Sequence, residues 1–507
     1  MSHETGAVRD AIAPRSAFYQ GPFGRICDDL PPWSPPGVGD GELAQHFLNI
    51  ANQRMIELPS TLPADVPPPP FGADPADDPG NATLPAGYTY FGQFVDHDIT
   101  FDPASSLVRQ NDPNKLLNFR TPRLDLDCVY GRGPDDQPYL YDNTTPAAAK
   151  KFLIGAVAGS AHADLPRNAD GRALIGDARN DENAIVSQLH LAFLTAHNTL
   201  VDRAVALGQP DPFERARTTL RWLYQWIVWQ DFLKRITLTS IHANALRLRK
   251  PLNGVATWER GLKDVYDWRD RPYIPVEFAG AAYRFGHSMV RNSYQTNISP
   301  RGFGAFVPIF DNTVPGDPDD LRGFRPMRPE NVIQWDWFVK MQTSLPGNFP
   351  QLARKIDTKL ANALAFLHEG APGSPMNVLA SRNLLRGVRL ELPSGPDVAR
   401  KFGLTPIALD PDEPQALWYY VLKEAETQTP AANAGNRLGK LGSIIVSAVF
   451  AGLLAGDPRS FFSMQPTWTP DADPLLRAAE DRVDDGANWT LASIIRISGR
   501  PFHAGQF

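Results

Sequence analysis

The sequence predicts a mainly α-helical fold with few short β pieces and long loops. Between residues 185 and 200 apolar side chains recur every three or four positions, which is the period of one helix face. Alternating strand patterns are scarce, and 48 prolines and 39 glycines imply long irregular connections around a helical body. His190 and His197 lie seven residues apart in the first helix, where histidines so spaced are usually core or surface residues.

A second helix is expected to begin at Asp211, which suits the N-cap position. Pro212 suits its first turn, and Glu214 is expected to complete a capping box. The segment that follows, up to Trp229, is apolar nearly all round, so this helix should be buried. Further helices are expected at residues 331–343, 353–367, 413–426 and 441–455.

The length and the proline distribution predict an arm followed by one large domain. A chain of 507 residues can bury a sizeable core. Residues 1–85 contain proline-rich pieces that read as extended segments. Phe18, Phe23 and Trp33 lie among them, and a free linker would be poorer in aromatic residues. We therefore expect residues 1–85 to pack as an arm on a domain formed by residues 86–507.

Composition excludes several classes of protein. The formal net charge of -6, with no basic stripe, predicts no nucleic-acid partner. Cys27 and Cys128 are far apart, so neither a disulfide framework nor a zinc site is expected. The start shows no signal-peptide pattern, and the longest apolar run, 444–455, is too short to span a bilayer. We expect a soluble protein, cytoplasmic or exported without an N-terminal signal peptide.

The most distinctive polar motif is Asp96-His97-Asp98, which follows a run of aromatic residues. Adjacent side chains on a helix or strand diverge, so these three cannot share one target. If all three are functional, each must serve a different purpose around one site. Taken alone, the triplet also suits a polar helix end whose histidine bonds a neighbouring carbonyl group.

Three further segments carry polar residues of mixed type. Acidic residues at 177–182 precede the first helix, where they also suit a helix N-terminus. His287 lies on an otherwise apolar segment, where a lone histidine is more often a satisfied core residue than a ligand. Asn383 and Arg386 add an amide and a guanidinium. Each segment is a weak signal by itself.

In this order and spacing, the four motifs resemble the animal-type haem peroxidase superfamily, also called the peroxidase-cyclooxygenase superfamily, and in particular its bacterial members. The relatives include myeloperoxidase, lactoperoxidase and peroxidasin. The resemblance runs from about residue 88 to residue 458. It implies a large single-domain helical haem peroxidase fold, with residues 86–507 as the catalytic domain and haem b as the cofactor.

The resemblance assigns the first two motifs to the distal side of the haem. His97 matches the distal histidine, Gln93 the distal glutamine and Arg179 the distal arginine. Asp96 and Glu182 match the carboxylates that form ester links to the haem. The methionine that forms a sulfonium link in myeloperoxidase is replaced by Asn183, so that third link is not expected.

The other two motifs match the proximal side. His287 matches the ligand of the haem iron, and Asn383 the asparagine that accepts a hydrogen bond from its ring N–H. Arg284 and Arg386 match the arginines that pair with the haem propionates. The family's Arg-Asp-His-Gly sequence after the asparagine is replaced by residues 388–391, which leaves the surroundings of Arg386 less well defined.

Asp98 and the loop at 121–131 resemble the calcium site of the family. Hard oxygen donors without sulfur or imidazole suit Ca²⁺. A turn rich in acidic residues is the alternative interpretation of this loop. The resemblance implies ligands from Asp98, Thr121 (hydroxyl and carbonyl), Arg123 (carbonyl), Asp125 and Asp127.

The implied activity is that of a haem-dependent peroxidase, an oxidoreductase acting on a peroxide as acceptor. It would use hydrogen peroxide to oxidise halides, thiocyanate or small aromatic donors through a ferryl intermediate. In that chemistry His97 would serve as general acid and base, and Arg179 would stabilise developing charge. Because the sulfonium link is not expected, iodide, bromide, thiocyanate or aromatic donors are expected in preference to chloride.

Two alternatives remain at this stage. A fatty-acid dioxygenase of the cyclooxygenase or α-dioxygenase kind shares the fold, but its tyrosine lies three residues before the proximal histidine, where this chain has Arg284. Tyr283 is one residue off, which is about 100° on a helix, so it should point elsewhere. The second alternative is a catalytically silent calcium-binding scaffold, which intact His97, Arg179 and His287 disfavour.

Overall fold

The fold is described from a computed structural model. The described residues are 21–56, 80–101, 116–249, 257–267, 273–298, 300–302, 305–311, 316–341, 349–365, 367, 374–483 and 488–507. These residues form a mainly α-helical body with a few two-stranded ribbons, as the sequence predicts.

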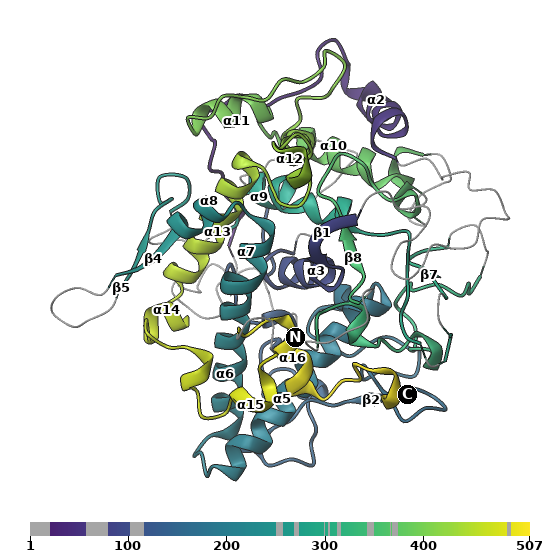
Figure 1. Ribbon diagram of the computed structural model, residues 1–507, viewed down its shortest axis with the longest axis vertical. Helices are drawn as coiled ribbons and strands as arrows, with labels where there is room; N and C mark the ends of the chain where they lie inside the picture. The colour runs from purple at the N-terminus through teal and green to yellow at the C-terminus, as the bar shows by residue number, and fades with distance from the viewer. Residues whose placement is uncertain are drawn as a thin grey trace, which may run out of the picture.

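The centre of the molecule is occupied by helix α3 (Gly87–Ile99), which longer helices surround (Figure 1). Helix α3 packs against α5 (Ala184–Ala206), and α5 in turn packs against α6 (Pro212–Ile227) and α16 (Leu491–Ser498). Most side chains of α3 and α5 are buried, so the two helices form the middle of the core. The motif Asp96-His97-Asp98 therefore lies on a helix that is enclosed by protein.

The two long helices begin at side-chain caps. The Oδ1 atom of Asn183 accepts a hydrogen bond from the backbone N–H of Val186 (2.9 Å). Asp211 accepts from the N–H of Glu214 (3.3 Å). The Glu214 carboxylate pairs with Arg217 (3.2 Å) instead of completing the expected capping box. Each cap satisfies a backbone donor and is worth about 1 kcal/mol.

Helix α6 continues into α7 (Leu233–Ile236) through a π-helical turn, η7 (Val228–Phe232). Such a turn inserts one extra residue and changes the direction of the side chains that follow. Asp231 in this turn accepts a hydrogen bond from the Tyr88 hydroxyl at the start of α3. The turn thereby attaches α6 to the central helix.

Later segments close the other side of α3. They are the 3₁₀ helix η8 (Ala282–Met289) and helices α10 (Leu379–Arg389), α12 (Leu417–Glu426) and α13 (Lys440–Gly456). Helix η8 packs against α3, α12 and α13. The remaining α-helices of the described residues are α2 (Leu43–Ile50), α4 (Asp127–Tyr130), α8 (Thr239–Ala245), α9 (Val276–Gly280), α11 (Gly395–Lys401), α14 (Phe461–Met464) and α15 (Ala478–Asp481).

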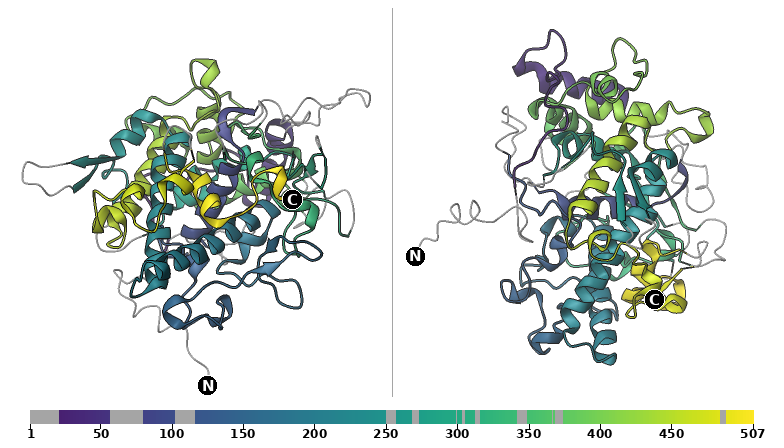
Figure 2. Two further views of the ribbon diagram at one scale, coloured as in Figure 1. Left: turned by 60° about the horizontal axis from the view of Figure 1, so that its bottom comes forward. Right: turned by 90° about the vertical axis from the view of Figure 1, so that its left-hand side faces the viewer.

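The strands form four antiparallel two-stranded ribbons in the described chain. The ribbon β4–β5 projects from the body, as Figure 1 and the left view of Figure 2 show. The pairs are β1 (Gly80–Pro85) with β8 (Leu352–Arg354), β2 (Gly155–Ala156) with β3 (Ala163–Asp164), β4 (Leu246–Arg249) with β5 (Thr257–Arg260), and β6 (Ser293–Tyr294) with β7 (Val307–Pro308).

The described parts of the expected arm are residues 21–56 and 80–85, which contain strand β1 and α2, a helix that the proline-rich pattern did not predict. Phe23 is buried, and the N–H of Trp33 donates to the carbonyl of Leu392 (2.9 Å). Arg389 at the end of α10 pairs with Asp40. Phe18 falls outside the described residues, and the domain boundary at residue 85 stays a prediction.

The helices expected at 441–455 and 413–426 are present, the second beginning four residues later than expected. The predictions of helices at 331–343 and 353–367 are wrong. The described residues of the first segment, 331–341, hold only short 3₁₀ turns, because backbone N–H groups such as that of Trp335 bond to the distant residues 501–502. The second begins with strand β8, which pairs with β1.

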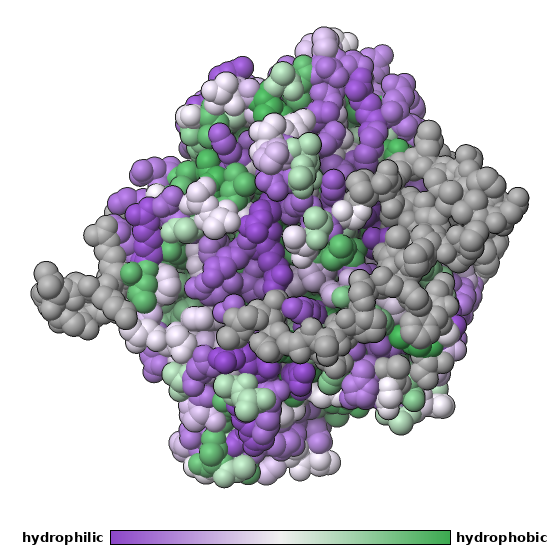
Figure 3. Space-filling view, viewed as in Figure 1, coloured by the Kyte–Doolittle hydropathy of each residue, from purple (hydrophilic) through white to green (hydrophobic). Residues whose placement is uncertain are grey.

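The surface carries hydrophilic residues over most of the face in Figure 3, with hydrophobic residues in scattered groups. Among the described helices, none combines the length and apolar character needed to cross a bilayer.

Candidate active site

A cavity of about 550 Å³ lies between α3 on one side and η8 with α10 on the other. That volume is in the range of cofactor and small-molecule sites. Most of the residues expected at the site line it: Gln93, Asp96, His97, Arg179, Glu182, Arg284, His287, Asn383 and Arg386. Four segments that are far apart in the sequence therefore meet in one place.

His97 enters the cavity from the last turn of α3. Its Nδ1 atom lies 2.8 Å from Oδ1 of Asn180, so Nδ1–H donates to the amide oxygen. The other ring nitrogen, Nε2, then carries a lone pair and is left for the cavity. Burial lowers the pKa of His97 to about 3, and Arg179 acts in the same direction. The imidazole is therefore neutral near pH 7 and can accept a proton.

Arg179 is held beside His97 by several acceptors. Its Nη2 donates to the carbonyl of Thr100 (2.6 Å), to the carbonyl of His97 (3.2 Å) and to Asp177 (2.8 Å). The guanidinium also lies over the Phe101 ring, 4.6 Å from its centroid. Although burial acts to raise it, the pKa of Asp177 is held well below its usual range by Arg179 and Arg120. The anchored guanidinium gives the distal end of the cavity a fixed positive charge.

Two carboxylates line the same side. Asp96 accepts from the Thr100 hydroxyl (3.0 Å), and burial raises the pKa of Asp96. Glu182 accepts from the side-chain amide of Gln93. The oxygen of that amide accepts from Nδ2 of Asn183 (3.2 Å). Gln93 is thus tied to Glu182 and Asn183, and both carboxylates face the cavity.

His287 faces the cavity from η8. Nδ2 of Asn383 lies 2.8 Å from Nδ1 of His287. The amide nitrogen faces the ring here, whereas the family pattern implies the amide oxygen. Rotating the amide by 180° exchanges the two atoms without changing its shape. Burial lowers the pKa of His287 to about 3, with Arg284 and Arg386 acting in the same direction.

The two sides of the cavity differ in charge. The α3 side presents Asp96 and Glu182, and the η8 and α10 side presents Arg284, Arg382 and Arg386. The 3₁₀ geometry places residues three apart on the same face, which explains why Arg284 and His287 both face the cavity. A bound group with carboxylates would find its counter-charges on this second side.

Tyr283 lines the cavity, so the expectation that it points elsewhere is wrong. All residues from 283 to 287 line the cavity, so this segment runs along the wall and does not present one face alone to it. The ring stacks on Phe278, with 4.7 Å between centroids, and the hydroxyl donates to the carbonyl of Gly92 (3.3 Å). Tyr283 therefore links η8 to α3 across one wall of the cavity.

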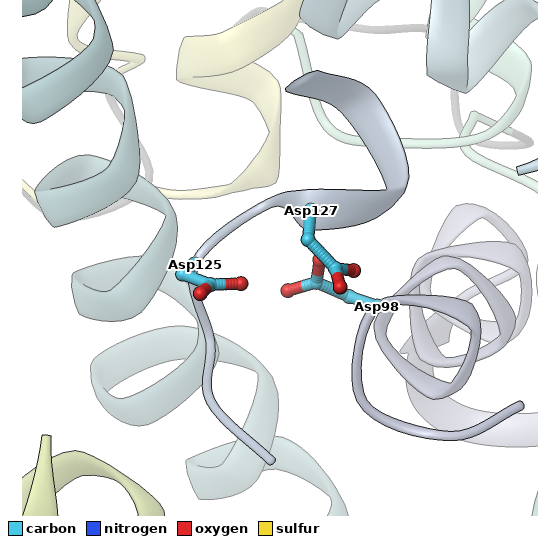
Figure 4. A group of neighbouring side chains, drawn as sticks. All are labelled: Asp98, Asp125 and Asp127. Carbon is cyan, nitrogen blue, oxygen red and sulfur yellow. The ribbon is translucent and has the colours of Figure 1, made fainter. Parts of the chain in front are cut away.

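The expected calcium residues also come together. Asp98 projects from the end of α3 toward Asp125 and Asp127 in the following loop (Figure 4). One ligand oxygen from each of the three lies within 4.8 Å of the others. The Thr121 hydroxyl donates to Asp125 (2.9 Å), so it lies in the same group. Burial raises the pKa of Asp98 and of Asp127, and the neighbouring carboxylates add to the effect.

The calcium loop has the backbone that such a group needs. Leu126 adopts a left-handed conformation (φ 60°), which turns the chain between Asp125 and Asp127. The N–H of Leu126 donates to Asp98 (3.2 Å). The side chain of Arg123 is buried and faces Asp457 (3.8 Å), while its carbonyl belongs to the loop. Three carboxylates this close, two of them buried and the third half-buried, favour a bound cation.

Several residues of the site were not predicted from the sequence. Asn180 contacts His97, His190 contacts Asn180, Asp177 binds Arg179, and Arg382 lines the cavity. A signal existed for Arg382, because it lies four residues before Arg386 and so on the same helix face. No local pattern could identify Asn180, because its partner His97 is 83 residues away.

Solved structures share the fold. Peroxidase A from Dictyostelium discoideum superposes with a TM-score of 0.59 at 16% sequence identity, covering 94% of this chain and 95% of that one. The fatty acid alpha-dioxygenase of Oryza sativa superposes with a TM-score of 0.55 at 15% identity, covering 96% of this chain and 80% of that one. At these identities the likeness concerns the fold alone.

Sequence relatives carry peroxidase names. A peroxidase-like protein of Margaritifera margaritifera is 27% identical over 268 residues, which are 42% of this chain and 32% of that protein. Heme peroxidase 2 of Caenorhabditis elegans is 34% identical over 123 residues, 23% of this chain and 16% of that protein. The aligned segments thus span about a third or less of the length of these relatives.

The family described as animal haem peroxidase matches residues 105–387, more than half of the chain. The matched segment contains Arg179, His287 and Asn383, and it begins shortly after His97. The chain belongs to the animal haem peroxidase family.

Proposed function

We propose that the protein is a haem peroxidase that uses hydrogen peroxide to oxidise small electron donors. The observation that carries the proposal is the pair of neutral imidazoles, buried His97 and half-buried His287, which face one cavity from opposite sides. One imidazole has its Nδ1 bound to an asparagine oxygen and keeps Nε2 for a proton. The other is free to use Nε2 as a metal ligand once its asparagine presents the oxygen.

The residues present fit haem b. The cavity has apolar lining residues, and three arginines line one side of it. This combination suits a flat apolar group with two carboxylates. His287 would hold the iron, with Asn383 accepting from its Nδ1–H, and Arg284 and Arg386 would hold the propionates. When bound, the haem supplies the iron on which peroxide is reduced and the oxidising equivalents that a donor then refills.

The distal residues provide acid-base and electrostatic functions. His97 takes a proton from hydrogen peroxide at Nε2 and returns it to the departing oxygen, which requires the neutral imidazole. Arg179, fixed by Asp177 and two carbonyls, stabilises negative charge on the departing oxygen. Gln93 lies one helical turn before His97 and contributes an amide to the same wall.

Asp96 and Glu182 are proposed to form ester links to the haem. Both carboxylates face the cavity from the α3 side. Asn183 caps helix α5 and binds Gln93, so the position of the sulfonium-forming methionine is taken by a residue that cannot form that link. Proteolysis followed by mass analysis of the released haem should find it modified through oxygen, and free haem b would contradict the proposal.

Calcium is the proposed occupant of the carboxylate group at Asp98, Asp125 and Asp127. Thr121 and the carbonyl of Arg123 would complete an all-oxygen set. Asp98 follows His97 directly, so the ion would fix the backbone of the distal histidine. We propose that the calcium is structural for the distal side.

The donors proposed are iodide, bromide, thiocyanate or small aromatic molecules. Haem-loaded protein should show a Soret band and should oxidise bromide or an aromatic donor only when hydrogen peroxide is present. Chloride oxidation at neutral pH as fast as bromide oxidation would contradict the donor assignment. A chain that takes up no haem would contradict the whole proposal and would favour a silent scaffold.

A fatty-acid dioxygenase is the second candidate, and the position of Tyr283 favours it. This tyrosine lines the cavity, so an oxidisable side chain is present near the expected haem. The hydroxyl is bound to the Gly92 carbonyl, and the position three residues before His287 holds Arg284. Oxygen uptake after adding a fatty acid without peroxide would establish this alternative, and peroxide-dependent donor oxidation without oxygen uptake would exclude it.

A further inference from the structure

The amide of Asn180 lies between two histidines. Its Oδ1 is 2.8 Å from Nδ1 of His97, and its Nδ2 is 3.0 Å from Nδ1 of His190. Asn180 and His190 are both fully buried. Asn180 belongs to the 3₁₀ turn η6 (Ala178–Asp181), directly after Arg179, and His190 belongs to α5. One buried amide thereby joins the distal wall to the core helix behind it.

The hydrogen bonds that link His97, Asn180 and His190 depend on one another. A neutral imidazole has one donor and one acceptor nitrogen, whereas an amide has a donor end and an acceptor end. With the oxygen toward His97, Nδ1 of His97 must carry the hydrogen. With the nitrogen toward His190, Nδ1 of His190 must accept. Turning the amide over would require the opposite tautomer at both histidines.

We propose that Asn180 and His190 are positioning residues that hold His97 with a protonated Nδ1 and a free Nε2 toward the cavity. The inference rests on the proposed peroxidase function, because it concerns the base in that reaction. Asn180 fixes the direction and the tautomer of His97. His190 fixes the orientation of the Asn180 amide.

The bonding of His190 supports this role over a purely structural one. Its other nitrogen, Nε2, is buried and has no hydrogen-bond partner in the part of the chain that the structure describes. An apolar side chain would fill the same space without leaving a buried polar atom unsatisfied. The presence of an imidazole at this position is therefore explained by the hydrogen bond that its Nδ1 accepts from Asn180. Burial lowers the pKa of His190 to about 3, so the ring is neutral, as an acceptor must be.

His197 provides a matched comparison on the same helix. It is also fully buried, and burial lowers its pKa to about 3. Both of its nitrogens are satisfied away from the cavity, by the Tyr130 hydroxyl (2.9 Å) and by the Lys150 carbonyl (3.3 Å). Replacing His197 should therefore affect folding alone, whereas replacing His190 should affect the distal base.

The test measures two rate constants on the haem-loaded full chain. The first is for hydrogen peroxide and the second for cyanide, which binds ferric haem as the anion after hydrogen cyanide gives its proton to the distal base. The rate constant for donor oxidation is measured beside them. The variants are Asn180→Leu, Asn180→Asp, His190→Leu, His190→Gln and, as the control, His197→Leu.

We expect Asn180→Leu to lower the peroxide and cyanide rate constants by about 10²-fold, within the usual contribution of a general base. Asn180→Asp keeps an acceptor for Nδ1–H and should stay within about threefold of the natural protein. His190→Leu should lower both constants by about tenfold, and His190→Gln, which keeps an acceptor oxygen, should restore most of the loss. Donor oxidation should change less than about twofold in every variant.

Three results would overturn the inference: unchanged cyanide binding in Asn180→Leu, equal losses in Asn180→Asp and Asn180→Leu, or losses in His197→Leu that match those in His190→Leu. If Asn180→Leu does not fold, the pair His190→Leu and His190→Gln decides by the presence or absence of rescue. If the natural chain takes up haem but reacts with neither peroxide nor cyanide, the proposed function itself fails. The two failures are therefore distinguishable.

Discussion

The two histidines of the cavity have similar surroundings but differently bonded partners. Each has a pKa lowered to about 3, and each has Nδ1 at 2.8 Å from an asparagine amide. The amide beside His97 is held at both ends, by His97 and by His190. The amide beside His287 has no second partner among the residues that the structure describes.

The difference teaches how one residue type acquires two functions. On the α3 side the protein itself determines which nitrogen of His97 carries the hydrogen. On the η8 side the Asn383 amide can turn, so a bound metal at Nε2 would determine the tautomer of His287. The charges differ between the two sides, because the first side has two carboxylates beside Arg179 and the second side has three arginines.

The largest effect is expected from removing the proximal imidazole. His287→Gly should abolish stable haem binding, because it removes the only side chain proposed to ligate the iron. Haem titration followed at the Soret band measures this. Added imidazole should restore the band by occupying the vacated space. If His287→Gly binds haem as the natural chain does, while a His97 variant does not, the two sides have been assigned the wrong way round.

His97→Gln tests the distal side and should leave haem binding intact. Loss of the general base should lower kcat/KM for hydrogen peroxide by about 10²- to 10⁴-fold. The rate constant for donor oxidation should change little, since donors react after the peroxide step. Steady-state kinetics with both substrates varied separates the rate constant for peroxide from the rate constant for donor oxidation. A loss confined to the rate constant for donor oxidation would contradict the assignment.

Acid should destabilise the fold through its buried histidines, including those that lie outside the cavity. The folded-state pKa is about 3 for His197 and about 4 for His242, below the usual 6.5. The unfolded chain therefore binds more protons as pH falls. Stability should be fully present above about pH 6.5 and should fall by about 1.4 kcal/mol per pH unit for each such group as pH drops toward the folded pKa.

Denaturant unfolding of His197→Gln at several pH values tests this dependence. The variant should show a shallower loss of stability between pH 6 and pH 4 than the natural chain (about one proton fewer taken up on unfolding). His503→Gln, a change at an exposed histidine, is the control variant. Parallel curves for the natural chain and His197→Gln would show that this imidazole is not held neutral by burial.

Removing calcium should affect the distal side more than the proximal side. Asp98 is attached to His97 through the backbone, and its carboxylate lies within 4.8 Å of ligand oxygens of Asp125 and Asp127. At a calcium concentration one hundred times Kd, bound calcium should add about 3 kcal/mol to the unfolding free energy. Chelation should remove this contribution. It should also slow the reaction with peroxide. Chelated, calcium-free protein with an unchanged haem spectrum and unchanged turnover would refute the structural role.

The smallest effect is expected at Arg382. It lines the cavity beside Arg386, so Arg382→Gln should weaken haem binding by a few-fold, or about 1 kcal/mol. Arg389→Gln is the matched control on the same helix, because Arg389 pairs with Asp40 of the arm and does not line the cavity. Equal haem affinities of Arg382→Gln and the natural chain would remove Arg382 from the site.

Local patterns predicted the long helices but not the irregular segments. Helix α5 follows from its apolar period, and α6 from Asp211 and Pro212, because those signals act within a few residues. Residues 331–343 have a similar apolar content, but their backbone groups bond to the distant residues 501–502. The tryptophans in this segment are buried, but they lie in a 3₁₀ turn and do not follow the period of an α-helix face.

The same limit applies to the site. The motifs indicated His97, Arg179, His287 and Asn383 because each motif is continuous in the sequence. Asn180 sits inside one of these motifs, yet its bonds to His97 and His190 appear only when α3, η6 and α5 come together. The place of Tyr283 was likewise invisible to a rule based on helix faces, because residues 283–287 line the cavity together.

The most direct test of the account is the response of the Soret band to one equivalent of hydrogen peroxide, followed by stopped-flow absorption. The natural chain loaded with haem should show a rapid second-order change in the band. His97→Leu should show the same initial Soret band with a change at least 10²-fold slower. A chain without a Soret band after haem loading, or an equally fast change without His97, would contradict the central claim that these two imidazoles divide iron binding and proton transfer between them.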